Sequence, residues 1–125
     1  MIQFTIPYPE TKRGKAAFCK AYSLNAYYAG KHWAIRKKEA DAIHQMTVLS
    51  MRRARVRKAP EKEPVRIRFD WDDGLDIDNH AVIGKCVVDA MKGYVLEDDN
   101  PRRYVEVTHG FWHGGCIRVT VEAMP

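Results

Sequence analysis

Several common sequence signals are scarce or absent in this chain of 125 residues. No apolar run approaches the ~18 residues that a membrane-spanning helix needs, so no membrane association is expected. The N-terminal residues lack the basic start and apolar core of a secretory signal. Without a P-loop or a GxGxxG motif, no nucleotide cofactor is expected. The absence of a nucleophile elbow argues against a serine hydrolase.

Cysteine is sparse, with three residues far apart in the sequence: Cys19, Cys86 and Cys116. An odd number without CxxC spacing argues against a disulfide framework or a zinc knuckle. We therefore expect reduced thiols in a cytoplasmic protein. His109 and His113, with Cys116, offer only three loosely spaced zinc ligands, so surface or half-buried histidines are the favoured interpretation.

Charge is distributed unevenly along the chain. The net charge is +5, with +10 in residues 1–62 and −5 in residues 63–125. A basic half suits a polyanion such as nucleic acid. An acidic half would repel that partner unless its carboxylates hold divalent cations. The alternative, that both halves are ordinary solvated faces, stays open at this point.

The hydropathy pattern predicts a single α+β domain over residues 1–125. Strands are expected at 2–6 and 64–71, followed by a hairpin that turns at Gly114-Gly115. Helices are expected at 33–57 and 79–92, and residues 10–30 are expected to form a basic, aromatic loop. The predicted architecture is a small mixed β-sheet with two helices on one face.

The helix expected over residues 33–57 combines an apolar stripe with basic side chains. The stripe comprises Ile35, Ala42, Met46, Leu49 and Val56. Basic residues on or near this helix are predicted to contact DNA phosphates: Lys31, Arg36, Lys37, Lys38, Arg52, Arg53 and Arg55. For the last three, interaction with the helix C-terminus is the structural alternative. Nearby aromatic residues can stack on bases or belong to the core: Tyr27, Tyr28 and Trp33.

An acidic constellation occupies residues 76–99. In an extended chain, the carboxylates of Asp76 and Asp78 would point the same way. On a helix, Asp78, Lys85 and Asp89 would share one face. The chain can then return the Asp98-Asp99 pair to the start of that helix. Each feature alone has a structural explanation as a cap, an ion pair or a turn, but the clustered carboxylates would repel one another unless neutralised.

Clustered carboxylates without histidine or cysteine suit Mg²⁺, with Mn²⁺ as a substitute. A metal held there can activate water and orient a phosphodiester. Lys85 can offset charge on the scissile phosphate or align the water. The acidic constellation therefore favours a metal-dependent phosphodiester hydrolase.

The same residues resemble the signature of the RusA family of Holliday-junction resolvases. The resemblance runs through Asp76-Ile77-Asp78-Asn79, Lys85, Asp89-Ala90-Met91, Gly93 and Glu97-Asp98-Asp99. It implies a homodimeric, RusA-like α+β endonuclease from a phage, a prophage or a bacterial cell. In that family, paired Mg²⁺-dependent sites nick four-way DNA symmetrically during recombination and repair. The resemblance assigns metal binding to Asp76, Asp78 and Asp99, with Asp98 assisting, and the essential lysine to Lys85.

Two departures from the family pattern affect these expectations. The interval from Asp78 to Lys85 is about three residues longer than in the best-known member. The family's basic run before the first aspartate is replaced by residues 71–75, so DNA contacts are expected to shift to the 33–57 helix. Two alternatives stay open: a non-catalytic DNA-binding or recombination accessory protein, and a nuclease for other branched nucleic acids.

Overall fold

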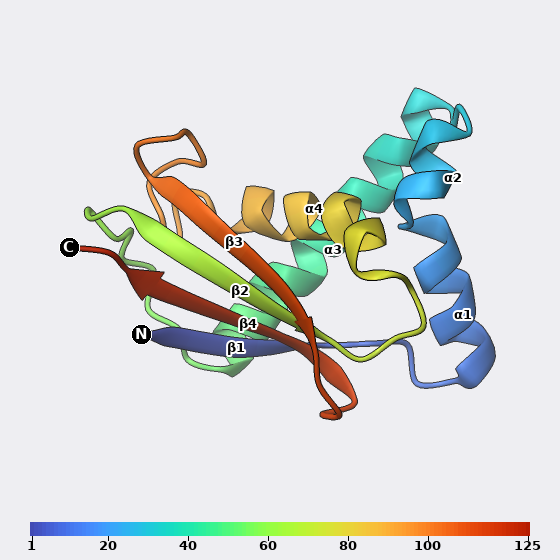
Figure 1. The fold of residues 1–125 in the computed structure, drawn as a ribbon, viewed down its shortest axis with the longest axis horizontal. Helices are drawn as coiled ribbons and strands as arrows, with labels where there is room; N and C mark the ends of the chain where they lie inside the picture. The colour runs from blue at the N-terminus through green and yellow to red at the C-terminus, as the bar shows by residue number, and fades with distance from the viewer.

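The computed structural model describes residues 1–125, and its centre is a four-stranded mixed β-sheet (Figure 1). The strands are β1 (Ile2–Pro7), β2 (Val65–Trp71), β3 (Tyr104–Phe111) and β4 (Cys116–Ala123). Their order is β1-β4-β2-β3. Only β2 and β3 run parallel, because β4 is antiparallel to both of its neighbours. The α+β class and the mixed sheet are confirmed.

The last two strands do not form the expected hairpin. β2 lies between β3 and β4 and pairs with both of them. The connection crosses the end of β2, where Trp112 N donates to Trp71 O at 3.0 Å. Gly115 has a φ of +76°, so the glycine turn itself is present. A local turn signal does not show whether the two strands it joins pair with each other or have a third strand between them. The hairpin prediction was wrong for this reason.

β2 confirms the predicted half-buried strand. Val65, Ile67, Phe69 and Trp71 are buried against the helices, while the opposite face of the sheet is polar. On that polar face Asp70 is buried as well, because Arg68 and Arg118 each donate to its carboxylate at 2.9 Å. The alternating pattern therefore gives the core side of the sheet correctly.

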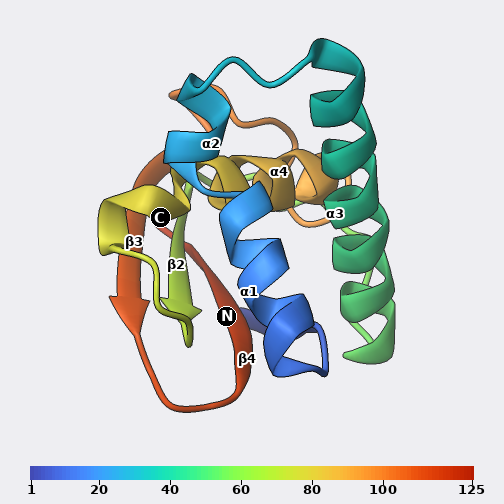
Figure 2. The same cartoon turned by 90° about the vertical axis from the view of Figure 1, so that its right-hand side faces the viewer.

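The helices gather on the apolar face of the sheet (Figure 2). The two long ones are α3 (Trp33–Arg53) and α4 (Ala81–Met91), and a 3₁₀ turn, η1 (Ile77–His80), precedes α4. Both are slightly shorter than predicted. α4 packs against α3 and buries its apolar side chains in the core. No helix combines the length and the apolar character needed to cross a bilayer.

The predicted apolar stripe of α3 was correct only in part, because Met46 and Val56 pack against the core but the other three residues are exposed. Ile35 and Leu49 are 52% and 46% exposed, and the buried residues are Ile43, Thr47, Ser50 and Met51. Two of these are polar, and their hydroxyls donate to the carbonyls of Ile43 and Met46 at 2.8 Å. Because the helix backbone satisfies these hydroxyls, α3 can bury a face that apolar spacing alone does not identify.

The expected loop over residues 10–30 is helical, so the sheet carries four α-helices rather than two. Thr11 is the N-cap of α1 (Lys12–Ala21), and Ser23 is the N-cap of α2 (Leu24–Tyr28). Each capping hydroxyl accepts a hydrogen bond from a backbone amide three residues later. Phe18 and Tyr22 of this segment enter the core. The caps were visible in the sequence, but basic and aromatic composition favoured a loop.

Candidate active site

The four predicted metal-binding aspartates form two pairs at opposite ends of the β2–α4–β3 unit. Asp76 and Asp78 follow the C-terminal end of β2, whereas Asp98 and Asp99 precede the N-terminal end of β3. Because β2 and β3 are neighbouring parallel strands, the C-terminal end of β2 and the N-terminal end of β3 lie at opposite ends of the strands. α4 separates them by ~16 Å. The expectation that Asp98-Asp99 returns to the start of the helix was therefore wrong.

Asp98 and Asp99 already have partners within the chain. Asp98 accepts hydrogen bonds from Asp99 N at 2.9 Å and Asn100 Nδ2 at 3.0 Å, which lowers the pKa of its carboxyl. Lys92 lies 3.6 Å from Asp99 and 3.5 Å from Asp89. Burial lowers the pKa of Lys92, but these carboxylates outweigh it and raise that pKa overall. In this arrangement the pair shapes a turn and its charge is partly neutralised.

Asp76 and Asp78 are exposed, and their carboxylates make no hydrogen bond or ion pair with the rest of the chain. Asp76 has extended backbone (φ −60°, ψ 151°), and Asp78 lies in the first turn of η1. They are therefore not on one face of a strand, as the extended interpretation required. Within one chain, no group of three or more His, Cys, Asp or Glu side chains is arranged to hold a metal ion.

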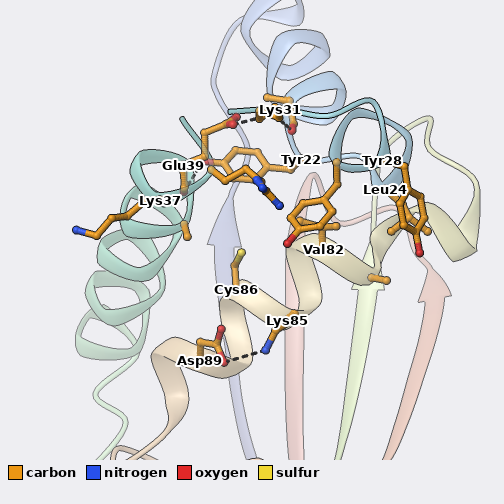
Figure 3. A pocket seen from close by; sticks show the side chains of 15 residues that line it. Tyr22, Leu24, Tyr28, Lys31, Lys37, Glu39, Val82, Lys85, Cys86 and Asp89 are labelled. Atoms are coloured by element: carbon orange, nitrogen blue, oxygen red, sulfur yellow. Dashed lines mark hydrogen bonds and ion pairs between the residues drawn. The ribbon is translucent and has the colours of Figure 1, made fainter. Parts of the chain in front are cut away.

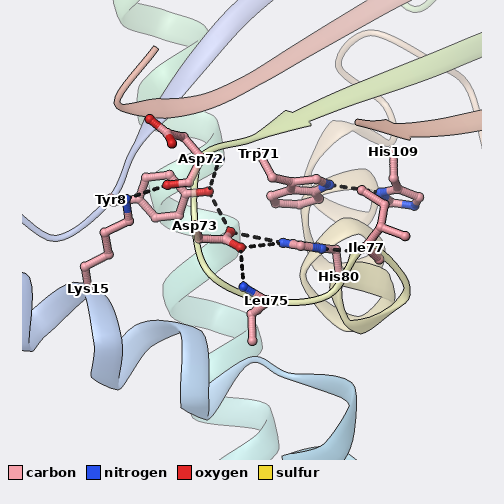
Figure 4. Close-up of polar contacts among 9 residues, drawn as sticks. All are labelled: Tyr8, Lys15, Trp71, Asp72, Asp73, Leu75, Ile77, His80 and His109. Atoms are coloured by element: carbon pink, nitrogen blue, oxygen red, sulfur yellow. Dashed lines mark hydrogen bonds and ion pairs between the residues drawn. The ribbon is translucent and has the colours of Figure 1, made fainter. Parts of the chain in front are cut away.

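A buried pair closes the loop that carries Asp76 and Asp78 (Figure 4). His80 Nε2 lies 2.8 Å from Asp73 Oδ1, and His80 Nδ1 lies 3.1 Å from Ile77 O. Each ring nitrogen of His80 therefore faces an oxygen of the chain, one from a carboxylate and one from a backbone carbonyl. Its ring stacks on Trp71 at 4.3 Å between centroids. This contact ties residue 73 to residue 80 and fixes the intervening backbone.

Tyr8 completes this buried network from β1's side of the domain. Its hydroxyl donates to Asp73 Oδ2 at 2.7 Å and accepts from Asp72 N at 3.0 Å. Burial raises the pKa of Asp73, but the hydrogen bonds from His80 and Tyr8 outweigh it and lower that pKa overall. Asp73 is therefore an ionised structural residue. Its contact with His80 was not predicted from the sequence, because the two residues are seven apart and meet only through the path of the intervening loop.

His109 of β3 lies beside this network. Trp71 Nε1 donates to His109 Nδ1 at 3.1 Å, which requires a neutral ring with its hydrogen on Nε2. Burial, then the charge of His80, lowers the pKa of His109. His109 is therefore a half-buried structural histidine whose Nδ1 is already occupied.

A cleft of about 470 Å³ lies between α2, α3 and α4 (Figure 3). Its lining is mostly apolar, with four cations: Lys31, Arg36, Lys37 and Lys85. Lys85 lies 3.6 Å from Asp89 on the α4 wall, as helical spacing predicted. Burial, then the charge of Asp89, raises the pKa of Cys86, so this thiol is not activated as a nucleophile.

The predicted DNA-binding residues divide into two groups along α3. The first group lies near the helix N-terminus: Lys31, Arg36, Lys37 and Lys38. In this group Lys31 pairs with Glu39 at 2.7 Å and Arg36 lies over the Tyr27 ring, whereas Lys37 and Lys38 are exposed. The second group, at the helix C-terminal end ~25 Å along the axis from Arg36, is exposed as well: Arg52, Arg53 and Arg55. α3 therefore offers two basic ends rather than one continuous basic face.

No protein-family model matches this chain, and a search of curated proteins also gives no match. The functional assignment therefore depends on the sequence motif and on the geometry of these residues.

Proposed function

We propose that this chain is a Mg²⁺-dependent, structure-selective endodeoxyribonuclease that resolves four-way DNA junctions by paired symmetric nicks. The observation that carries the proposal is the pair of exposed carboxylates, Asp76 and Asp78, without a partner in the chain. The Asp73–His80 contact fixes their loop. η1, which contains Asp78, contacts α2 and leads into α4. Both of these helices line the cleft that carries the cations. The RusA-like motif supports the same assignment.

The donor chemistry of Asp76 and Asp78 fits Mg²⁺, which takes few protein carboxylates and retains positions for water and phosphate. Bound Mg²⁺ supplies an activated water and neutralises charge on the scissile phosphate. Lys85, with a side chain 72% exposed, is free to approach that phosphate and offset its negative charge. The Asp73–His80 contact keeps the two carboxylates in place. Asp98 and Asp99 of the same chain do not fit this site, because they lie at the opposite end of α4.

A homodimer through β3 would resolve this separation. β3 is an outer strand of the sheet, and three of its side chains are 45–52% exposed: Val105, Val107 and Phe111. It contains neither the lysine nor the proline that commonly protects an edge strand from pairing. An apolar, unprotected edge of this kind favours addition of another strand. We therefore place a second copy of β3 against it.

Antiparallel pairing about a two-fold axis puts the start of one β3 beside the end of the other. Asp98 and Asp99 of one copy would then lie on the side of Asp76 and Asp78 of the other. Two equivalent composite sites would result, as two symmetric nicks require.

The proposal is tested by strand-specific cleavage of end-labelled four-way junctions beside matched linear duplex, with Mg²⁺ or EDTA. We expect symmetric nicks on the junction alone, only with Mg²⁺. Asp78→Asn should reduce cleavage by at least ~100-fold while junction binding is retained. Asp41→Asn, an exposed carboxylate change on α3, is the matched control and should cleave normally.

Two results would favour the other candidate functions. Junction binding without cleavage in either Mg²⁺ or Mn²⁺ would indicate a DNA-binding accessory protein. Preferential cleavage of flaps or branched RNA would indicate a nuclease for a different branched substrate.

A further inference from the structure

The helix α1 carries a basic surface that no part of the chain neutralises. It contains four cations and no acidic residue: Lys12, Arg13, Lys15 and Lys20. Lys12, Arg13 and Lys20 are exposed, and their side chains make no ion pair or hydrogen bond with the rest of the chain. Helical spacing puts these three within about 100° of the helix circumference. They therefore form one basic side, which faces solvent.

The opposite side of α1 is already occupied by the core. Phe18 is buried, and its ring packs on those of Tyr8 and Tyr22 at 6.0 and 4.8 Å between centroids. A basic amphipathic helix that binds a membrane needs a free apolar side to enter the lipid. Because α1 has no such free side, its basic side fits a polyanion held in water better than a lipid surface.

A groove of about 550 Å³ runs between α1 and residues 72–75. Figures 1 and 2 both show α1 beside this loop, which joins β2 to η1. Lys12 and Lys20 line the groove ~12 Å apart along the helix axis, with the small side chain of Ala16 between them. Lys15 reaches across and donates to the backbone carbonyl of residue 72, which fastens the helix to the loop (Figure 4).

The carboxylates on the loop side of the groove have partners within the chain. The Asp73 side chain is fully buried against His80, and Asp72 Oδ2 accepts a hydrogen bond from Gly115 N at 2.8 Å. The loop wall of the groove ends at Leu75, immediately before the exposed Asp76. A polyanion that lies along α1 is thereby led to the candidate metal ligands.

We infer that α1 holds the phosphodiester backbone of the DNA strand that enters the site of Asp76 and Asp78. Lys12, Arg13 and Lys20 each contact a phosphate, and the ~12 Å between the first and the last spans three to four steps of one strand at ~3.4 Å each. Such contacts position the substrate without reading its sequence. This inference rests on the proposed function and names a basic surface, distinct from both ends of α3, that positions the cleaved strand.

The salt dependence of junction binding tests the inference. Fluorescence anisotropy with a labelled four-way junction is measured in EDTA between about 50 and 200 mM KCl. Lys12→Gln and Lys20→Gln should each lower the slope of log Kd against log salt by about 0.9, and the triple variant Lys12→Gln, Arg13→Gln and Lys20→Gln by about 2.7. The charge-conserving triple variant Lys12→Arg, Arg13→Lys and Lys20→Arg should keep the wild-type slope.

Arg66→Gln is the positional control, because Arg66 is a half-exposed cation on the polar face of the sheet, away from the helices. It should change the slope by less than about 0.3. Unchanged slopes in the Gln variants, an equal loss in Arg66→Gln, or a wild-type chain that does not bind the junction would overturn the inference. Unchanged junction slopes with binding to phosphatidylserine vesicles that the triple Gln variant loses would assign α1 to a membrane surface instead.

This test is independent of cleavage, because no Mg²⁺ is present. Slopes that fall as expected, with no nicking of the junction in Mg²⁺, would show that α1 binds DNA and that the nuclease proposal alone fails. Nicking in Mg²⁺ with unchanged slopes would overturn the role of α1 and leave the nuclease proposal in place.

Discussion

Asp73 and His80 close the loop that presents Asp76 and Asp78. Their side chains are fully buried, and His80 has hydrogen-bond acceptors at both ring nitrogens. Removing either partner leaves the other buried without its partner, which commonly costs about 3 kcal/mol for a buried ion pair. These two residues therefore determine both the stability of the loop and the position of the candidate metal ligands.

Asp73→Asn and His80→Ala should each lower the free energy of unfolding in urea by about 3 kcal/mol. Asp41→Asn, which removes an exposed carboxylate 3.9 Å from Lys37, is the control. Its effect should stay below about 0.5 kcal/mol. Equally small effects for all three variants would show that the buried pair does not stabilise the loop.

The half-buried His109 should make the stability of the folded protein depend on pH. Burial and the charge of His80 lower the pKa of this histidine in the folded protein, so the unfolded chain binds its proton first as pH falls. The free energy of unfolding should therefore decrease from about pH 7 to pH 5. The lowered pKa of Asp73 extends the loss below about pH 4. Urea unfolding across this range should show a flatter slope between pH 7 and 5 for His109→Gln, and an unchanged slope would contradict this role.

At the scale of single elements, the sequence predicts what is set by neighbours along the chain. β2 alternates buried and exposed residues as expected, because alternation follows directly from the strand pleat. The burial of α3 was not predictable from apolar spacing, since Thr47 and Ser50 replace two of the expected apolar contacts. Strand adjacency was also missed, because the placement of β2 between β3 and β4 depends on contacts distant in sequence.

The β3 edge gives a prediction about oligomeric state. We expect a wild-type dimer in light scattering coupled to size-exclusion chromatography, and a monomer for Val107→Asp, because this change places a charge on the apolar edge. Leu49→Asp is a matched control on α3, since Val107 and Leu49 are 45% and 46% exposed. A wild-type monomer at all concentrations, or a dimer that persists in Val107→Asp, would contradict an interface through β3.

At the scale of the whole molecule, the candidate site illustrates what the motif leaves undetermined. Its residue types and spacing predict that Asp76, Asp78 and Lys85 belong to one functional region, and the structure places the two aspartates before α4 and Lys85 in the middle of that helix. The motif does not specify that parallel pairing of β2 and β3 puts Asp98 and Asp99 at the opposite end of the strands. Only the topology shows that the two aspartate pairs of one chain lie apart.

Mixing two inactive variants tests this composite site most directly. Asp78→Asn and Asp99→Asn should each be inactive alone on a labelled four-way junction with Mg²⁺. In a mixed dimer, one site combines the intact Asp78 of one copy with the intact Asp99 of the other. After subunit exchange, the mixture should recover about a quarter of wild-type nicking, as single rather than paired nicks. A mixture that stays inactive, although both variants dimerise and bind the junction, would contradict a site shared between two copies.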